Sequence, residues 1–166
     1  MEKKIKIIHL TSVHPRYDTR IFFKMCLSLV NAGYDVSLIV ADNKGNEIKN
    51  KVSIVDVGIN RSGRLFRLTK IVKLIYKKAK ELNGDIYHLH DPELIPIGLK
   101  LKKLGKKIIF DAHEDLTKQI LSKHYLNKIS KVILSKLYEY YERWNLPKFD
   151  MVISATPYIR DKLLKL

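Results

Sequence analysis

Short apolar runs alternate with amphipathic segments along nearly the whole chain, and this alternation constrains the fold more than any other feature. The runs have the length of buried strands, while the segments between them repeat their apolar residues with a helical period. Strands that alternate with helices predict an α/β domain with a doubly wound, mainly parallel sheet and helices on both faces. The expected strands are residues 4–10, 34–41, 52–57, 85–90, 107–111 and 151–154.

The expected helices lie between these strands. Residues 64–82 give the clearest pattern, with apolar side chains on one face and lysines or arginines broadly opposite. The segment 126–145 places apolar and aromatic residues on one stripe, and we expect its aromatics to pack on the sheet. This stripe consists of Leu126, Ile129, Ile133, Leu137, Tyr140 and Trp144. The other expected helices are residues 19–32, 93–104 and one that opens at Thr156-Pro157.

Length and composition indicate one globular domain over residues 1–166. Hydrophobic residues make up 46% of the chain and charged residues 30%, a balance typical of folded rather than disordered proteins. The single cysteine, Cys26, fits a reducing compartment and is expected to be a small buried side chain. No apolar run has the length of a secretory signal or of a membrane span, so we expect a cytoplasmic protein. The last helix stops without a capping signal, which favours a chain that continues in a longer protein over a natural end.

The chain is strongly basic, with a net charge of +15. This charge favours a polyanionic partner: nucleic acid, an anionic membrane face or a phosphorylated substrate. It does not choose among the three. The aromatics do not form an exposed-sheet RNA-reading pattern, so nucleic acid is not expected.

Polar residues follow two of the predicted strands. His88 to Glu93 and Asp111 to Asp115 bring histidines and carboxylates to the strand ends. Because parallel neighbouring strands end at the same edge, these residues line the crevice where open α/β sheets bind ligands. Within this rim His113 is interpreted as an acid/base or as a hydrogen-bond partner for a substrate hydroxyl.

The loop after the first strand carries His14, Arg16, Asp18 and Arg20. Helix amides and a guanidinium at this place would suit a phosphate or sugar hydroxyls. The alternative is a solvated turn in which Asp18 caps the helix and the arginines pair with carboxylates. The residues by themselves leave both interpretations open.

Several common sites are absent from the sequence. No glycine precedes Gly33, so the glycine-rich turn of dinucleotide-binding domains is missing. Gly58–Leu65 has the glycine spacing of a P-loop but carries Arg64-Leu65 where lysine and a hydroxyl residue belong, so we expect a loop that enters a helix. His88 and His90 point the same way on a strand and could chelate an ion, but a position of His88 inside the sheet is favoured and no metal is expected.

Five segments together resemble the N-terminal domain of glycosyltransferase family 4 enzymes, and they span essentially the whole chain. They are HLTSVHPRYDTRIFFKM, AGYDVSLIVA, DIYHLHDPEL, KKIIFDAHED and FDMVISATPYIRDKL. The resemblance implies the Rossmann-like, acceptor-side half of a GT-B fold, with the donor-binding C-terminal domain absent from this chain. It departs from many relatives in the first loop, where Val13-His14-Pro15 replaces a glycine pair.

The resemblance also implies a function. It implies the acceptor-binding half of a retaining glycosyltransferase that moves a sugar from a nucleotide-sugar to a lipid-linked or cell-surface polysaccharide acceptor, with no metal and no further cofactor. The nucleotide-sugar would bind mainly to the missing domain, so the chain alone is expected to be inactive. His113 is the expected catalytic residue. The expected substrate-binding residues are His14, Arg16, Asp18, Arg20, His90, Asp91, Glu93 and Glu114.

The lysines favour an anionic membrane as a further partner, which places the enzyme on the inner face of the plasma membrane. The alternative function is a stand-alone module that binds acceptor or recruits a separate catalytic partner to the membrane. A basic nucleic-acid-binding domain ranks below both.

Overall fold

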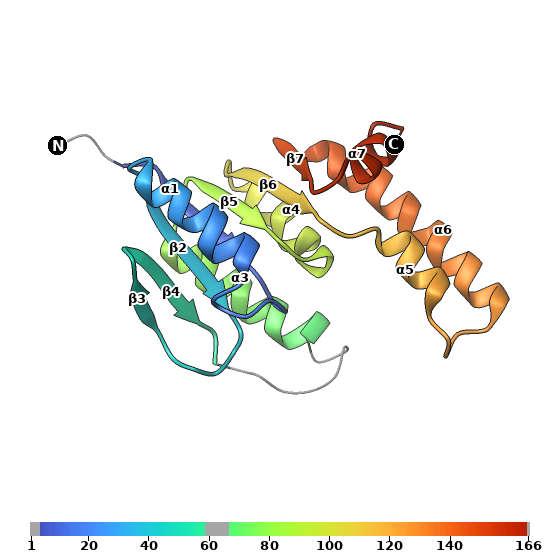
Figure 1. Cartoon of the computed structure of the whole chain (residues 1–166), viewed down its shortest axis with the longest axis horizontal. Helices are drawn as coiled ribbons and strands as arrows, with labels where there is room; N and C mark the ends of the chain where they lie inside the picture. Colours follow the sequence, from blue (N-terminus) through green and yellow to red (C-terminus); the bar gives the residue numbers. More distant parts are fainter. Residues whose placement is uncertain (1–3, 59–66, 166) are drawn as a thin grey trace.

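The computed structural model describes residues 4–58 and 67–165, in which seven strands form one sheet (Figure 1). Their order is β3-β4-β2-β1-β5-β6-β7. All neighbours are parallel except β3, which runs antiparallel to β4 at the edge. The strands are β1 (Lys6–Leu10), β2 (Asp35–Val40), β3 (Glu47–Lys49), β4 (Val52–Asp56), β5 (Ile86–Leu89), β6 (Lys107–Ala112) and β7 (Met151–Ser154).

Helices cover both faces of this sheet. The π-helical turn η1 (Thr19–Cys26) continues into α1 (Leu27–Asn31) on one face, and α3 (Val72–Leu82) and α4 (Ile95–Lys103) pack on the other. The remaining elements are η2 (Arg67–Ile71), η3 (Pro92–Leu94), α5 (Leu116–Ser122), α6 (Lys128–Asn145), η4 (Leu146–Lys148) and α7 (Pro157–Leu163). None of the described helices is both long and apolar enough to cross a membrane.

Two apolar layers hold the sheet between the helices. Ile21, Phe22 and Cys26 of η1 pack against alternate residues of β2 and β4. On the other face Ile75 of α3 and Leu101 of α4 join alternate residues of β1, β5 and β6. The central strands are therefore buried on both sides, which explains why their sequences read as continuous apolar runs.

The structure confirms the predicted α/β fold, including the six expected strands and the burial of Cys26. Three short elements were not predicted, namely β3, α5 and η4. β3 has only three residues with charged ends, and α5 is a two-turn helix with little apolar periodicity. The first residues of the predicted helix 64–82 and most of the P-loop-like stretch lie outside the described residues.

The prediction for the aromatics of α6 is wrong in part. The hairpin of α5 and α6 stands out from the sheet beyond β6 (Figure 1), so only one side of α6 can be covered. The apolar stripe faces solvent instead of the sheet, since Ile129, Tyr140 and Trp144 are each exposed by more than 60%. The covered side instead carries the buried side chains of Ser135, Glu142 and Asn145.

Candidate functional site

A cavity of about 780 Å³ lies where β1, β5 and β6 end and the α5–α6 hairpin begins. One end of it is polar and lies at the strand edge. The other end is mainly apolar and runs between the two helices. The polar lining at the strand edge comprises His14, Asp91, Glu93, Asp111, His113 and Glu114. The lining from the hairpin includes Leu116, Ile120, Leu126, Leu134, Leu137, Tyr138 and Tyr141 together with the polar residues Gln119, Lys123 and Glu142.

Asp91 ties the loop after β1 to the end of β5. One of its carboxylate oxygens, Oδ2, accepts hydrogen bonds from Thr11 Oγ1 at 2.9 Å and from the Ser12 amide at 2.6 Å. Ser12 Oγ in turn donates to Glu93 Oε1 at 2.9 Å. These bonds fix a loop without glycine against the sheet edge, and the second Asp91 oxygen stays on the cavity side, 3.5 Å from His14 Nε2.

The imidazoles of His14 and His113 meet at this polar end. Their ring centroids are 5.1 Å apart in an edge-to-face arrangement. His14 is held by Asp18, 3.4 Å from its Nδ1, and by Asp91. His113 Nδ1 lies 3.2 Å from the Asp111 carbonyl oxygen, which can only accept, so in the neutral ring Nδ1 carries the proton and Nε2 has the lone pair. His113 is thereby placed in the tautomer that can take a proton from a hydroxyl group.

Asp111 lies beneath these rings and is fully buried. Arg20 donates to both of its oxygens, at 2.6 and 2.9 Å, and His90 Nδ1 lies 3.3 Å away. Burial by itself raises the pKa of Asp111, but the bonds from His90 and Arg20 outweigh it and hold the pKa well below its ordinary value. The carboxylate is therefore ionised near neutral pH, and its charge is balanced by Arg20.

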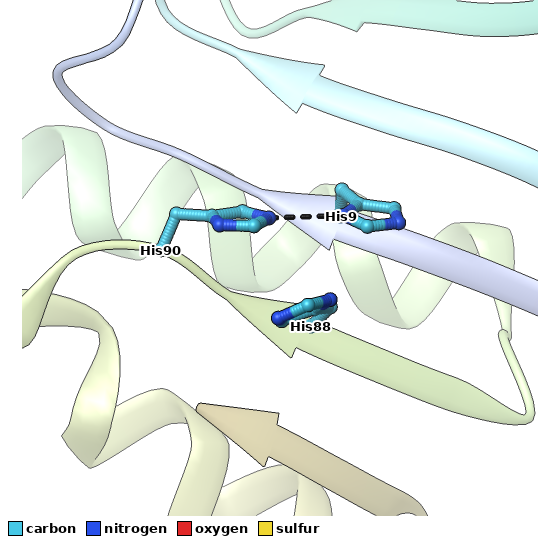
Figure 2. A group of neighbouring side chains, drawn as sticks. All are labelled: His9, His88 and His90. Carbon is cyan, nitrogen blue, oxygen red and sulfur yellow. Dashed lines mark hydrogen bonds between the residues drawn. The ribbon is translucent and has the colours of Figure 1, made fainter. Parts of the chain in front are cut away.

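Nine residues were predicted for this site, and five of them line the cavity: His14, Asp91, Glu93, His113 and Glu114. His90 lies below it, completely buried against Asp111 and His9 (Figure 2). Arg20 acts on the site through Asp111. Whether any of these residues binds substrate stays a prediction.

Arg16 and Asp18 belong to the scaffold in this structure. The Arg16 side chain is 5% exposed and pairs with Asp42 and Glu47, which anchors the loop after β2. Asp18 Oδ1 accepts from the amides of Arg20 and Ile21 and caps η1. Of the two interpretations of this loop, the structural one therefore describes Arg16 and Asp18.

Glu142 is a cavity residue that the sequence analysis missed. It lies on the covered side of α6, and its Oε2 accepts from Lys162 Nζ of α7 at 3.2 Å. Burial raises the pKa of Glu142 above its ordinary value, against the opposing effect of Lys162. The sequence held no signal for this role, because a charged residue opposite an apolar stripe normally faces solvent.

A sequence model of Glycosyltransferase Family 4 matches residues 19–166, which is most of the chain. The chain belongs to this family. No curated protein sequence matches it. The family 4 match begins at η1 and includes the ends of β5 and β6, so it contains most of the cavity lining.

Solved structures with the same fold include GT-B glycosyltransferases. Sucrose-phosphate synthase from Thermosynechococcus elongatus superposes with a TM-score of 0.70 at 13% identity, over 98% of this chain and 45% of that one. A trehalose-6-phosphate protein from E. coli, bound with UDP-2-fluoro glucose, gives 0.58 at 12% identity, over 96% and 42%. A putative UDP-N-acetylglucosamine 2-epimerase from Listeria monocytogenes gives 0.58 at 15% identity, over 99% and 42%.

This family 4 chain therefore has the Rossmann-like architecture of one half of a GT-B protein, as predicted. It spans less than half the length of these three structures. At sequence identities of 12–15%, these similarities show a common fold and nothing about substrates.

Proposed function

We propose that this chain is the acceptor-binding half of a retaining glycosyltransferase that takes its sugar from a nucleotide-sugar. The donor would be held mainly by a second, C-terminal domain across the cavity. The acceptor would be a lipid-linked intermediate or a cell-surface polysaccharide. The observation that carries the proposal is the two-ended cavity, which joins a polar rim to a mainly apolar wall.

The polar end suits the reacting hydroxyl of an acceptor. Carboxylates of Asp91 and Glu93 accept hydrogen bonds from hydroxyl groups, and the lone pair on His113 Nε2 can accept a proton or orient the transferred sugar. Holding the acceptor oxygen in place next to the anomeric carbon supplies a large share of the acceleration by itself. No metal or further cofactor is assigned to the transfer step.

The apolar end suits a lipid anchor. Leu116, Ile120 and Leu134 offer only hydrocarbon surface, which a sugar chain would not need. A lipid-linked acceptor would place its sugar at the rim and the first part of its lipid between α5 and α6. Of the two acceptor classes, the cavity thus favours the lipid-linked one.

The exposed stripe of α6 supports a location at the inner face of the plasma membrane. Leu137 belongs to this stripe and also lines the cavity, so the apolar wall opens onto the stripe. Helical spacing places Lys136 and Arg143 along one edge of it, and Lys148 Nζ lies 4.7 Å from the centre of the Trp144 ring. Apolar and cationic side chains in this arrangement are typical of helices that lie on anionic lipid surfaces.

Sugar transfer by the full-length enzyme, measured before and after His113→Ala, tests the proposed function. We expect turnover to fall roughly 100-fold or more, since positioned acid–base groups contribute about 10²–10⁴-fold. His124→Ala is the matched control, because His124 is exposed on the loop between α5 and α6 and does not line the cavity. Undiminished turnover of His113→Ala would count against its role, and activity of the 166-residue chain alone would contradict the need for a second domain.

A further inference from the structure

Three histidines meet inside the sheet below the cavity floor (Figure 2). His9 of β1 lies opposite His88 of β5 in the parallel register, and His90 follows two residues after His88. All three side chains are therefore on the same face of the sheet. They are 0%, 5% and 0% exposed, so the three imidazole rings are shielded from bulk solvent.

Hydrogen bonds determine which nitrogens carry protons in two of the rings. Asp111 is ionised and can only accept, so His90 Nδ1 donates to it and His90 Nε2 is left with a lone pair. His9 Nδ1 lies 2.9 Å from this His90 Nε2 and must be its donor. In a neutral His9 ring the second nitrogen, Nε2, then has no proton, and burial lowers the pKa of His9 and keeps the ring neutral.

The His9 Nε2 lone pair has no hydrogen-bond partner. The same is true of His88 Nε2, and both atoms are fully buried. Leaving a polar nitrogen buried without a partner costs free energy, and native structures rarely accept two such atoms in one cluster. Two orphan nitrogens, one of them necessarily unprotonated, are what a cluster of metal ligands presents in the absence of its ion.

The distances and the surroundings fit an ion. Each ring offers one nitrogen within 4.8 Å of the other two. The nitrogens around tetrahedral Zn²⁺ are about 3.3 Å apart, so the three rings would move closer together when the ion binds. His90 already donates its outer N–H to a carboxylate, the arrangement that usually orients a metal-ligating histidine.

We propose that His9, His88 and His90 form a buried binding site for a borderline transition-metal ion such as Zn²⁺. His9 and His88 would bind the ion through their unpaired Nε2 atoms, and His90 through the Nε2 that now accepts from His9 Nδ1, so the ion would displace this hydrogen bond. It would stabilise the junction of β1 and β5 that supports Asp111 and Asp91, and it would not take part in sugar transfer. Because Arg20 already neutralises Asp111, lone pairs rather than charge attract the ion, so Mg²⁺ and Ca²⁺ are not expected to bind.

Titration of the 166-residue chain with Zn²⁺ tests this proposal by calorimetry, and Co²⁺ tests it by visible absorption. We expect one ion per chain, a higher melting temperature with Zn²⁺, and no effect of Mg²⁺. His88→Phe should weaken binding at least 100-fold, while His124→Ala, which removes an exposed histidine outside the cluster, should leave it unchanged. Absence of binding, or binding that His124→Ala abolishes and His88→Phe does not, would overturn the proposal.

A second measurement does not depend on whether the His88 variant folds. Long-range ¹⁵N–¹H NMR of the unaltered chain reports the proton on each ring nitrogen. We expect His9 to be in the Nδ1–H form and its ring resonances to shift when one equivalent of Zn²⁺ is added. A protonated Nε2 on His9, or ring signals of His9 and His88 that Zn²⁺ does not move, would contradict the site.

Discussion

Replacement of Arg20 by methionine tests whether the buried Asp111 carboxylate depends on its guanidinium partner. Asp111 is 0% exposed in its side chain, and Arg20 supplies two of its hydrogen bonds, at 2.6 and 2.9 Å. Removing one partner of a fully buried ion pair costs roughly 3–5 kcal/mol. The Arg20 side chain is 37% exposed, so solvent screens part of this interaction and we expect a loss of about 2–3 kcal/mol.

The expected loss depends on pH in a defined direction. In the native protein the pKa of Asp111 is depressed, so its contribution to stability is complete above its ordinary pKa of 3.8 and is lost as the pH falls below it. In Arg20→Met only His90 still opposes the effect of burial, so the pKa of Asp111 rises from its depressed native value. The carboxyl of the variant then takes up a proton at a higher pH than in the native protein, and the stability difference between the two proteins narrows as the pH falls toward this raised pKa.

Urea unfolding followed by circular dichroism, at pH 7 and near pH 4, measures both effects. Arg160→Met is the control, since Arg160 pairs with Asp161 on the surface with both side chains more than half exposed, and it should cost less than about 0.5 kcal/mol. Adding Asp111→Asn to Arg20→Met should recover part of the stability by removing the unpaired charge. The reasoning is refuted if Arg20→Met costs no more than Arg160→Met, or if its cost is the same at both pH values.

Three further predictions follow from the packing of the helices and from the exposed stripe. Gly98→Ala should lower the free energy of unfolding by about 1–2 kcal/mol in thermal unfolding, because the new methyl group would overlap the Leu89 side chain and contact the Phe149 ring too closely. Equal or higher stability would show that α4 can shift to make room. Lys162→Met should raise the pKa of Glu142 further and move its NMR titration toward neutral pH, since Lys162 Nζ is its cationic partner; an unchanged titration would contradict this pairing. The fluorescence emission of Trp144, the single tryptophan, should shift to shorter wavelength when anionic vesicles are added, but not when neutral vesicles are added. Ile133→Ser and high salt should each reduce this shift. Identical spectra with both vesicle types would exclude docking through this stripe.

Local sequence patterns were enough to predict the sheet and the edge at which polar residues gather. Apolar runs and helical periods are local properties, and parallel strands necessarily end at one edge. For this reason the meeting of His14, Asp91 and His113 could be expected, although these residues are far apart in the chain. The capping role of Asp18 could also be predicted, because this residue directly precedes the helix that begins at Thr19.

The sequence could not predict which side chains form ion pairs or hydrogen bonds with residues far away in the chain. Arg16 and Arg20 are four residues apart in one loop, yet one pairs with Asp42 and Glu47 and the other with Asp111. His90 follows a strand like a rim residue, but its ring turns inward to His9 and Asp111. Such choices depend on which distant side chains reach the same place, and that is decided only when the strands are assembled.

The sequence by itself determined the α/β order, the family and the rim of polar residues, because periodicity and strand direction are encoded locally. Only the tertiary structure decided the outward direction of the α6 stripe and the burial of three histidines in contact with one another. The physical reason is that amphipathicity states which side of a helix is apolar, but not whether a sheet, a lipid or solvent lies opposite it.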